Sequence, residues 1–337
     1  MQRGDYLIRK AIFATITLTV TIVFNFLLFR IMPGDPVQLV ASPRLPREAK
    51  ERVYELFGLD KPVWWDAEAM QAGDWKTAAF DTQFGAYLRN LARGDFGVSF
   101  ATRRDVNELL AERVWRTVIL LIIGQVVSIT LGITLGTIAS WRRGSKLDTG
   151  ILMYGLFTWS MPTFFFGIIL VVLARGILPT GRMVTPGMRP EDGWAYWRDV
   201  GRHLILPSIV LGVGYISSYM LVMRSSVVEI LSEDYILTAK AKGLTTFQIF
   251  KDHVFKNTML PMVTLIALTL GYTVSGSIEV ETVFSWPGIG QLMYQSVYDL
   301  DYPVMQGGFM LLAVSVIVAN FVADIAYMLL DPRVKVK

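Results

Sequence analysis

The sequence contains no cysteine and few charged residues. Of its 337 residues, 18% are Asp, Glu, Lys or Arg, and 53% are hydrophobic. The absence of cysteine excludes a disulfide framework, a thiolate metal site and a cysteine nucleophile. The charged fraction is well below the roughly one quarter that soluble globular proteins average, so a single soluble core and a disordered chain are both disfavoured.

Two further absences limit the possible enzyme classes. The chain has no Gly-x-x-x-x-Gly-Lys-Ser/Thr loop, which cradles phosphate in many ATP-binding proteins. Any ATP hydrolysis must therefore be supplied by another protein. The two histidines, His203 and His253, are isolated in the sequence, and no His-Glu-x-x-His motif is present. Isolated histidines are more typical of structure than of metal binding, which disfavours an intramembrane metalloprotease.

Long uncharged hydrophobic runs are the dominant feature that is present. An α-helix rises 1.5 Å per residue, so a run of 19 residues reaches about 28 Å, close to the thickness of the hydrocarbon core of a bilayer. The sequence therefore predicts an all-α integral membrane protein with six transmembrane helices. The runs that lack Asp, Glu, Lys and Arg are residues 11–29, 117–141, 149–174, 204–223, 257–278 and 302–323. Pro162 interrupts the third run and predicts a kink there.

The first hydrophobic run could also be a secretory signal peptide, because it follows Arg9 and Lys10. Its 19 uncharged residues exceed the usual signal-peptide core of about 7–15 residues. The following residues 32–36, Met-Pro-Gly-Asp-Pro, make a poor cleavage site. We therefore expect an uncleaved first span.

The distribution of Lys and Arg predicts that both termini are cytoplasmic. With that orientation, most basic residues of the short loops lie inside, and the outside loop 282–305 has none. Loop 175–203 argues against this orientation, because it would place five arginines outside. The long outside segment carries little weight, because long loops cross the membrane largely regardless of charge.

The predicted spans divide the chain into three parts. Residues 1–31 form an N-terminal tail and the first span, residues 32–115 form an extracytoplasmic insertion, and residues 116–337 form a core of five spans. Within this core, loop 225–260 is cytoplasmic. Its length of more than 30 residues leaves room for structure of its own.

The extracytoplasmic insertion has signals of folded structure. Residues 46–57 begin with Pro and end before a glycine, which predicts a helix, and residues 84–91 predict a second one. Trp64, Trp65 and Trp75 are typical of interfacial anchors or of a local core.

The cytoplasmic loop begins with the pattern of a short helix. Ser232 has the residue type of an N-cap, and Asp234 lies where the helix dipole favours an anion. Lys240 and Lys242 lie where the dipole favours cations, and Gly243 can adopt the left-handed conformation that ends a helix. The sequence therefore predicts one helix that stops at Gly243.

A second helix is predicted directly after this glycine. Thr245 and Gln248 have the spacing of a capping box, while Leu244 and Ile249 have the spacing of a hydrophobic staple. The apolar residues 247, 250 and 254 recur with helical spacing. Such a helix–glycine–helix hairpin fits a groove on a soluble partner, although an amphipathic loop lying on lipid headgroups would show the same periodicity.

Residues 234–243, Asp-Tyr-Ile-Leu-Thr-Ala-Lys-Ala-Lys-Gly, followed by residues 257–261, Asn-Thr-Met-Leu-Pro, resemble the EAA loop of ABC importer permeases. The spacing is that of the oligopeptide, dipeptide and nickel group. Five further segments resemble, in order, landmarks of the first permease subunit of that group. They are residues 32–36 (Met-Pro-Gly-Asp-Pro), 57–62 (Phe-Gly-Leu-Asp-Lys-Pro), 93–100 (Arg-Gly-Asp-Phe-Gly-Val-Ser-Phe), 178–181 (Leu-Pro-Thr-Gly) and 283–290 (Val-Phe-Ser-Trp-Pro-Gly-Ile-Gly).

This resemblance implies a permease subunit in the inner membrane of a prokaryote that forms half of a translocation pathway for peptides or similar solutes. It implies a second permease subunit, two ATP-binding subunits and an extracytoplasmic solute-binding protein as partners, with no nucleic acid. No cofactor is implied for this chain, because ATP and Mg belong to the partner subunits. The sequence does not distinguish a peptide from a nickel complex or an oligosaccharide.

The resemblance also assigns the cytoplasmic loop to docking on the ATP-binding subunit. The implied docking residues are Asp234, Tyr235, Thr238, Ala239, Lys240, Ala241, Lys242, Gly243, Leu244 and Phe247. Residues 237–239 read Leu-Thr-Ala where the family has Glu-Ala-Ala, so the acidic residue that names the motif is missing. That departure puts a polar contact in doubt.

The spans contain almost no ionisable residues, which disfavours a proton relay or an ion filter at mid-membrane. An ion channel or secondary transporter would need such charges or broken-helix ion sites, and a membrane scaffold would need no pathway. We expect a neutral pathway, although helix packing is a sufficient explanation for each polar candidate. The candidates are Asn25, Gln125, Ser217, Tyr215, Ser218, Tyr219 and Thr273, with Glu279 and Glu281 as an acidic outer vestibule.

Overall fold

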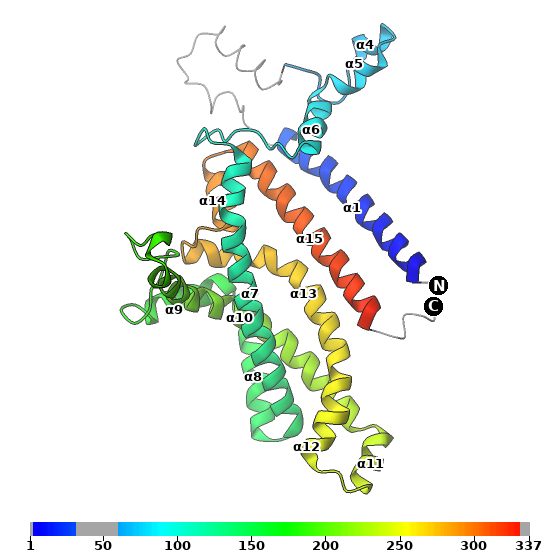
Figure 1. Cartoon of the computed structure of the whole chain (residues 1–337), viewed down its shortest axis with the longest axis vertical. Coiled ribbons are helices and arrows are strands. Elements are labelled where there is room, and N and C mark those ends of the chain that lie inside the picture. Colours follow the sequence, from blue (N-terminus) through cyan, green and yellow to red (C-terminus); the bar gives the residue numbers. More distant parts are fainter. Residues whose placement is uncertain (1–2, 32–59, 331–337) are drawn as a thin grey trace. The chain divides into compact units, whose positions relative to one another are not determined.

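The computed structural model describes residues 3–31 and 60–330, without the side chains of residues 3, 4, 31, 267, 270–276 and 326–330. The helix predicted at residues 46–57 lies outside the described residues. The described part is helical, apart from loops and one isolated antiparallel bridge between Val98 and Asp105 (Figure 1). This agrees with the predicted all-α class.

The α-helices are labelled in Figure 1. They are α1 (Arg3–Ile31), α4 (Ala67–Gln71), α5 (Trp75–Phe80), α6 (Gln83–Ala92), α7 (Val106–Trp141), α8 (Lys146–Ser160), α9 (Thr163–Leu173), α10 (Trp194–Leu231), α11 (Asp234–Ala241), α12 (Thr246–Ile249), α13 (Lys256–Val283), α14 (Ile289–Tyr298) and α15 (Tyr302–Leu330). A 3-10 turn, η1 (Pro190–Asp192), precedes α10, and a π-helical turn, η2 (Phe250–Phe255), precedes α13.

Four of the described helices, α1, α7, α10 and α15, are long and apolar enough to cross a membrane. The pair α8 and α9 also passes that test together, and α13, 28 residues long, contains the fifth predicted run. The chain is thus a multi-pass membrane protein. The count of six spans and their orientation remain predictions.

The third predicted span is broken, where the sequence predicted only a kink. Helix α8 ends at Ser160 and α9 begins at Thr163, with a bend of 103° between them. Pro162 has no backbone N–H and disfavours a helical conformation at the residue before it. Met161 is accordingly extended, with φ −85° and ψ 123°. The chain therefore leaves the helix at this point and starts a new one.

Helix α10 is longer than the predicted span 204–223 at both ends. It has 38 residues and retains its helical assignment through Pro207. Its first turns belong to the segment that the sequence assigned to the outside loop 175–203, and its last turns belong to the predicted cytoplasmic loop. The helix therefore includes part of the predicted outside loop at one end and part of the predicted cytoplasmic loop at the other.

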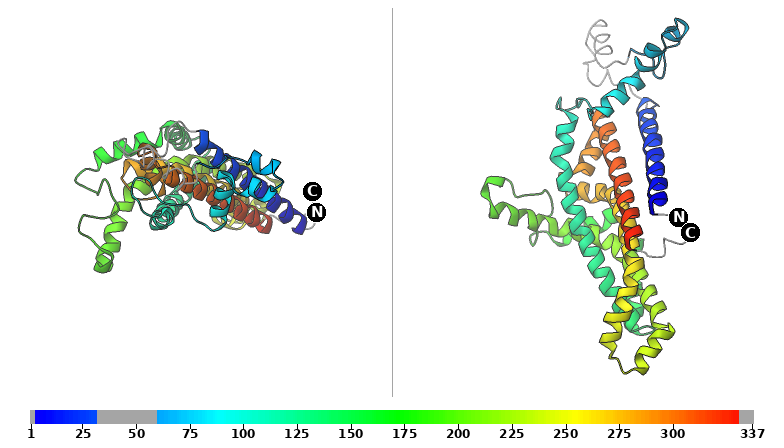
Figure 2. Two further views of the ribbon diagram at one scale, coloured as in Figure 1. Left: turned by 90° about the horizontal axis from the view of Figure 1, so that it is seen from above. Right: turned by 45° about the vertical axis from the view of Figure 1, so that its right-hand side comes forward.

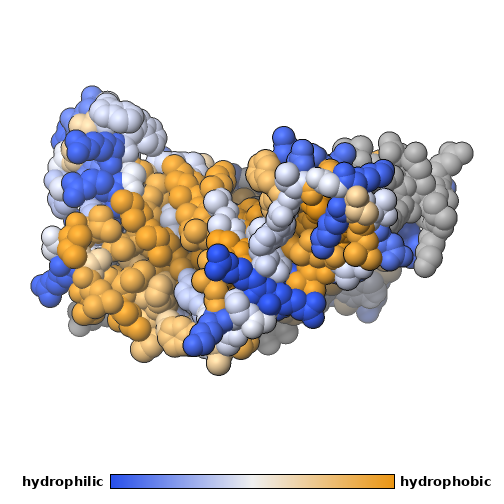
Figure 3. Space-filling view, turned by 90° about the horizontal axis from the view of Figure 1, so that it is seen from below, coloured by the Kyte–Doolittle hydropathy of each residue, from blue (hydrophilic) through white to orange (hydrophobic). Residues whose placement is uncertain are grey.

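The described residues form two compact units. One unit comprises residues 3–15, 115–291 and 315–330, and the other comprises residues 16–31, 60–114 and 292–314. Figure 2 shows the same ribbon from two further directions. Figure 3 shows hydrophobic residues over much of the face seen from below, as expected for helices that contact lipid.

Within the first unit, α7 and α10 approach closely at glycines. A Cβ atom added at Gly132 would lie 2.5 Å from the Cβ of Tyr219, and one added at Gly136 would lie 2.5 Å from the carbonyl oxygen of Met220. Real Cβ atoms do not approach other atoms this closely. Small residues thus allow the two backbones to pack, as is common between membrane helices.

In the second unit, aromatic rings join α1 to the insertion. The ring of Phe26 lies 5.2 Å from that of Trp64, 5.0 Å from that of Phe84 and 5.4 Å from that of Tyr87. Helix α6 confirms the helix predicted at residues 84–91. Trp64 therefore contributes to a local core, one of the two roles predicted for the tryptophans.

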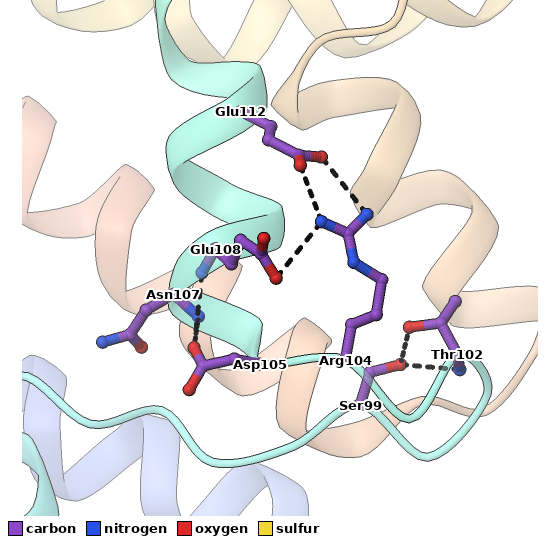
Figure 4. A network of polar contacts seen from close by, with 7 residues as sticks. All are labelled: Ser99, Thr102, Arg104, Asp105, Asn107, Glu108 and Glu112. Carbon is purple, nitrogen blue, oxygen red and sulfur yellow. Dashed lines mark hydrogen bonds and ion pairs between the residues drawn. The ribbon is translucent and has the colours of Figure 1, made fainter.

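Helix α7 begins eleven residues before the predicted span 117–141, because a polar network supports its first turns (Figure 4). The Asp105 carboxylate accepts hydrogen bonds from the backbone N–H groups of Asn107, at 2.7 Å, and Glu108, at 3.3 Å. The Arg104 guanidinium pairs with Glu112 at 2.6 Å and with Glu108 at 3.3 Å. These groups satisfy the free N–H groups and hold an exposed helix end.

Candidate functional site: the helical elbow between α10 and α13

Residues 232–256, called the elbow here, connect α10 to α13 and contain α11, α12 and η2 (Figure 1). The prediction that Ser232 is the N-cap of the first elbow helix is wrong. Ser232 follows the end of α10, and its hydroxyl donates a hydrogen bond of 2.6 Å to the carbonyl of Glu229. Glu233 is the N-cap of α11 instead. The hydroxyl is unavailable to α11 because it turns back toward the preceding helix.

Gly243 ends the first elbow helix as predicted. Its φ of +78° lies in the left-handed region that glycine adopts without steric cost. Its N–H donates to the carbonyl of Lys240 at 2.9 Å, and the N–H of Leu244 donates to the carbonyl of Ala239 at 3.3 Å. These bonds satisfy carbonyl groups at the end of α11 and reverse the chain direction.

The capping box at the start of α12 is confirmed. The backbone N–H of Thr245 donates to the Gln248 side-chain oxygen at 2.8 Å, and the Gln248 N–H donates to the Thr245 hydroxyl oxygen at 3.4 Å. The two residues of the predicted staple, Leu244 and Ile249, both pack into one hydrophobic cluster. The turn between the two elbow helices is therefore held from both sides.

The second arm of the elbow differs from a regular α-helix. Helix α12 has four residues and continues through η2 directly into α13. A π-helical turn inserts extra residues per turn and changes which face each side chain occupies. Val254 is consequently buried, Phe250 is half-buried and Phe247 is 71% exposed. The predicted ridge of three apolar residues is thus not one exposed surface.

The inner face of the elbow packs on the adjoining helices. The packed residues are apolar and buried, and they come from α10, the elbow and α13. They are Tyr219, Met223 and Val227 of α10, Ile236, Ala239, Ile249 and Val254 of the elbow, and Met262 of α13. Because protein interiors are close-packed, this cluster couples the position of the elbow to that of α10 and α13.

The outer face of the elbow carries most of the predicted docking residues. Leu244 is half-buried, and Ala239 is buried in the cluster described above. Ala239 lies three residues after the buried Ile236, so the two share one helix face. Ala239 therefore has a packing role within this chain, and its contact with a partner stays a prediction. The exposed residues are Asp234, Tyr235, Thr238, Lys240, Ala241, Lys242, Gly243 and Phe247.

Two residues that the sequence did not single out belong to this outer surface. Leu237 is 62% exposed and stands at the position of the missing acidic residue of the resembled Glu-Ala-Ala motif. Asn257 donates a side-chain hydrogen bond of 3.2 Å to the hydroxyl of Tyr235 and another of 2.7 Å to the carbonyl of His253. The match of residues 257–261 to the family motif was the available signal for Asn257.

An ion pair fixes the helix that leads into the elbow. The Arg224 guanidinium donates to both oxygens of Asp148, with Nε to Oδ1 at 2.7 Å and Nη2 to Oδ2 at 2.8 Å. The backbone N–H of Gly144 donates to the same carboxylate at 2.9 Å. Such a bidentate, largely buried pair ties α10 to the first turn of α8. The sequence indicates no role for Arg224 beyond its positive charge.

The polar candidates for a pathway are mostly occupied in contacts between helices. The hydroxyl of the fully buried Tyr219 donates to the Gln125 side-chain oxygen at 2.8 Å. Ser217 donates to the carbonyl of Gly155 at 2.8 Å, and Asn25 donates to the carbonyl of Gln306 at 3.1 Å. These contacts correspond to the packing alternative.

Three further pathway candidates are Tyr215, Ser218 and Thr273. Tyr215 and Ser218 are half-buried on α10. Thr273 lies in α13, and its side chain is outside the described part of the chain. Their assignment to a pathway stays a prediction.

Glu281 does not line an open vestibule in this structure. Its side chain is fully buried, and its carboxylate accepts hydrogen bonds from the Thr117 hydroxyl at 2.7 Å and the Gln291 N–H at 3.0 Å. A Cβ atom at Gly288 would collide with this carboxylate. Glu281 therefore organises the turn before α14. Glu279, by contrast, is exposed at the end of α13.

Comparison with known proteins identifies two matching family descriptions. Residues 3–121 match "Binding-prot-dependent transport system membrane comp, N-term", and residues 129–336 match "Binding-protein-dependent transport system inner membrane component". Together they cover most of the chain.

Individual relatives match over nearly their whole length. The chain is 32% identical to the probable peptide ABC transporter permease protein y4tP of Sinorhizobium fredii, covering 98% of this chain and 99% of the relative. It is 35% identical to the di/tripeptide transport system permease protein DppB of Pseudomonas aeruginosa, covering 92% and 93%. It is 33% identical to the glutathione transport system permease protein GsiC of Escherichia coli, covering 99% of each.

A solved structure shares the fold at lower identity. The inward-facing MetNI methionine ABC transporter matches 66% of this chain and 96% of its own, with a TM-score of 0.54 and 20% identity. At that identity the similarity supports the fold alone.

Proposed function

Because the chain belongs to the family of binding-protein-dependent transport system inner membrane components, we propose that it forms half of the translocation pathway of an ABC importer for peptides. The chain is a non-catalytic permease subunit, and ATP hydrolysis occurs on separate subunits. The family description also supports a location in the inner membrane of a prokaryote.

The proposed complex contains a second permease subunit, two ATP-binding subunits and an extracytoplasmic solute-binding protein. ATP and Mg bind to the ATP-binding subunits. Relatives named for peptides, dipeptides and glutathione support a peptide as the solute, rather than a nickel complex or an oligosaccharide. Specificity would be determined largely by the solute-binding protein.

The observation that carries the mechanism is the two-sided packing of the elbow. Its outer face exposes Leu237 and Phe247, while its inner face is packed on α10 and α13. The outer face docks on an ATP-binding subunit, and the inner face carries the movement to the spans. ATP binding then shifts the population between two arrangements of the spans. The size of this shift is limited by the difference in ATP affinity between the two arrangements.

A crosslinking experiment tests the docking face. The native chain has no cysteine, so single cysteines can be placed at will. We expect Leu237→Cys to crosslink to a cysteine on the ATP-binding subunit, and Ile236→Cys, its fully buried neighbour, to remain unlinked. Crosslinking of neither variant in an assembled complex would refute docking through this face.

A transport experiment tests the energy source. Vesicles that contain both permease subunits and both ATP-binding subunits should take up peptide only with ATP and the solute-binding protein. A catalytically inactive ATP-binding subunit is the matched control and should abolish uptake. Peptide flux without ATP would instead indicate a channel or a secondary transporter, and the proposal would fail.

A further inference from the structure

The N-terminal end of α10 carries an exposed stripe that the proposed function does not use. Trp194, Arg198, Arg202, Ile205 and Ile209 follow each other at intervals of four, four, three and four residues, so they lie on one face of the helix. All five are exposed, Trp194 by 81%, Ile205 by 40% and Ile209 by 37%. The stripe thus runs from an apolar part through two arginines to a tryptophan.

This order of residues matches the boundary of a bilayer. Exposed isoleucines suit the hydrocarbon region, and arginine and tryptophan suit the headgroup region. With a rise of 1.5 Å per residue, Arg202 lies about 5 Å and Trp194 about 17 Å along the axis beyond Ile205. At 38 residues α10 is about 57 Å long, so it has the length to reach past a hydrocarbon core of about 30 Å.

Helix α7 independently indicates the same position for the membrane boundary. Trp197, in the same turns of α10, contacts Trp115 of α7, with ring centroids 6.4 Å apart. Trp115 lies just before the uncharged run 117–141 begins. Two tryptophans from separate helices therefore meet at the start of the hydrophobic run of α7. Tryptophan is enriched at such boundaries between hydrocarbon and headgroups.

The two arginines of the stripe have their charges available. Within the described part of the chain, neither the Arg198 nor the Arg202 guanidinium forms a close ion pair or a hydrogen bond, and Arg202 acts on the Asp199 carboxylate only through its electrostatic field. The neighbouring carboxylate of Asp199 is held by Thr185, whose N–H and hydroxyl donate to it at 2.6 Å and 3.0 Å. The stripe therefore presents two guanidinium groups next to an apolar surface.

We propose that this stripe binds the headgroup phosphate of an anionic phospholipid in the leaflet opposite the elbow. Arg198 and Arg202 pair with the phosphate, because guanidinium groups bind phosphate through paired hydrogen bonds. Ile205 and Ile209 contact the acyl chains, and Trp194 lies at headgroup level. The proposal also accounts for the arginine-rich loop 175–203, which conflicts with a simple rule of positive charge inside.

The test uses the full chain with a single reporter cysteine. Gly201→Cys introduces a thiol beside Arg202, at a position where a Cβ atom meets no other atom within 4 Å. The thiol is labelled with bimane, and the labelled protein is reconstituted into two sets of phosphatidylcholine vesicles with the same phosphatidylglycerol content. In one set the bromine quencher is carried by phosphatidylglycerol, and in the other by phosphatidylcholine. Local quenching then reports which lipid contacts the stripe.

We expect phosphatidylglycerol to be enriched at the label by about fivefold for each arginine, the usual effect of a basic residue near an anionic surface. The double variant Arg198→Gln/Arg202→Gln should abolish the enrichment, and Arg198→Lys/Arg202→Lys should keep most of it. Arg142→Gln/Arg143→Gln removes the same charge from the far end of α7 and should leave the enrichment unchanged.

Several outcomes would overturn the proposal. Equal quenching of the label by the two brominated lipids, with Arg198 and Arg202 both present, would show that the stripe does not select an anionic headgroup. Loss of the preference on adding inorganic phosphate at constant ionic strength would indicate a site for free anions. Shielding of the label from both lipids by added solute-binding protein would indicate that a protein occupies the stripe.

Discussion

At the residue scale, the conformation of Gly243 makes a prediction about the elbow. A Cβ atom there would meet no atom within 4 Å, so the demand for glycine comes from φ +78° and not from space. A β-branched residue in this region costs about 1–2 kcal/mol or more, while Asn tolerates it. We expect Gly243→Val to reduce copurification of the ATP-binding subunit, and Gly243→Asn to retain most of it, with equal membrane insertion.

The comparison of these two variants separates two explanations. Both add a side chain to the exposed turn, but only one conflicts with the backbone conformation. If both reduce copurification equally, the partner surface and not the backbone would account for the glycine.

A second prediction at this scale concerns Ala239. Because it is buried beside Ile236, Ala239→Leu should overpack the cluster and destabilise the chain by about 1–3 kcal/mol. Thr238→Leu, at the exposed neighbouring position, should change stability by less than about 0.5 kcal/mol. Thermal unfolding of the purified chain in detergent measures both. Similar midpoints for the two variants would contradict the assignment of Ala239 to packing.

The residues that the sequence predicted correctly depend on local signals. Gly243 and the pair of Thr245 with Gln248 interact within a few positions of the chain, so their spacing was sufficient to identify them. The burial of Glu281, which we expected in a vestibule, could not be predicted in this way. It depends on Thr117, 164 residues away, and on the turn that folds around the carboxylate. Such a contact has no signature in the spacing of residues.

At the element scale, the ion pair between Asp148 and Arg224 should hold α8 against α10. Replacing either residue leaves its partner largely buried without its charge complement, which costs about 3–5 kcal/mol for fully buried pairs. Because the Arg224 side chain is 23% exposed, we expect about 1.5–3 kcal/mol for Arg224→Gln. The unfolding midpoint of the purified chain measures this loss.

A matched variant controls for the change in net charge. Arg142→Gln removes one positive charge from the exposed connection between α7 and α8 and should leave the midpoint nearly unchanged. If Arg142→Gln and Arg224→Gln had the same effect, net charge and not the ion pair would explain the loss.

Element boundaries were harder to predict than the elements themselves. Hydrophobic runs located the long helices, but α7 and α10 extend well beyond them, because polar helix turns at a membrane surface leave no hydrophobic signal. Pro162 predicted a disturbance but not its size. Whether a proline kinks or breaks a membrane helix depends on which neighbours satisfy the freed backbone groups.

At the scale of the whole molecule, the resemblance to a family predicted more than physical patterns did. Periodicity and composition established a membrane bundle with a structured cytoplasmic loop. An amphipathic loop on lipid remained equally compatible with that pattern, and only the ordered motifs distinguished a docking site. The reason is physical, because the proposed groove for the elbow would belong to another chain, and a surface of another chain leaves no trace in this sequence.

The last prediction concerns how the elbow transmits movement in the assembled importer. Ile249→Ala leaves a cavity beneath the elbow, at a cost of about 2–5 kcal/mol in packing, without altering the exposed face. The ATP-binding subunit should still dock, but less of its movement should reach α10 and α13. We therefore expect fewer peptides imported per ATP hydrolysed, measured as uptake and phosphate release in the same vesicles. Phe247→Ala, on the exposed face, should instead weaken docking and lower both quantities together. An unchanged ratio for Ile249→Ala would mean that the cluster does not carry the movement.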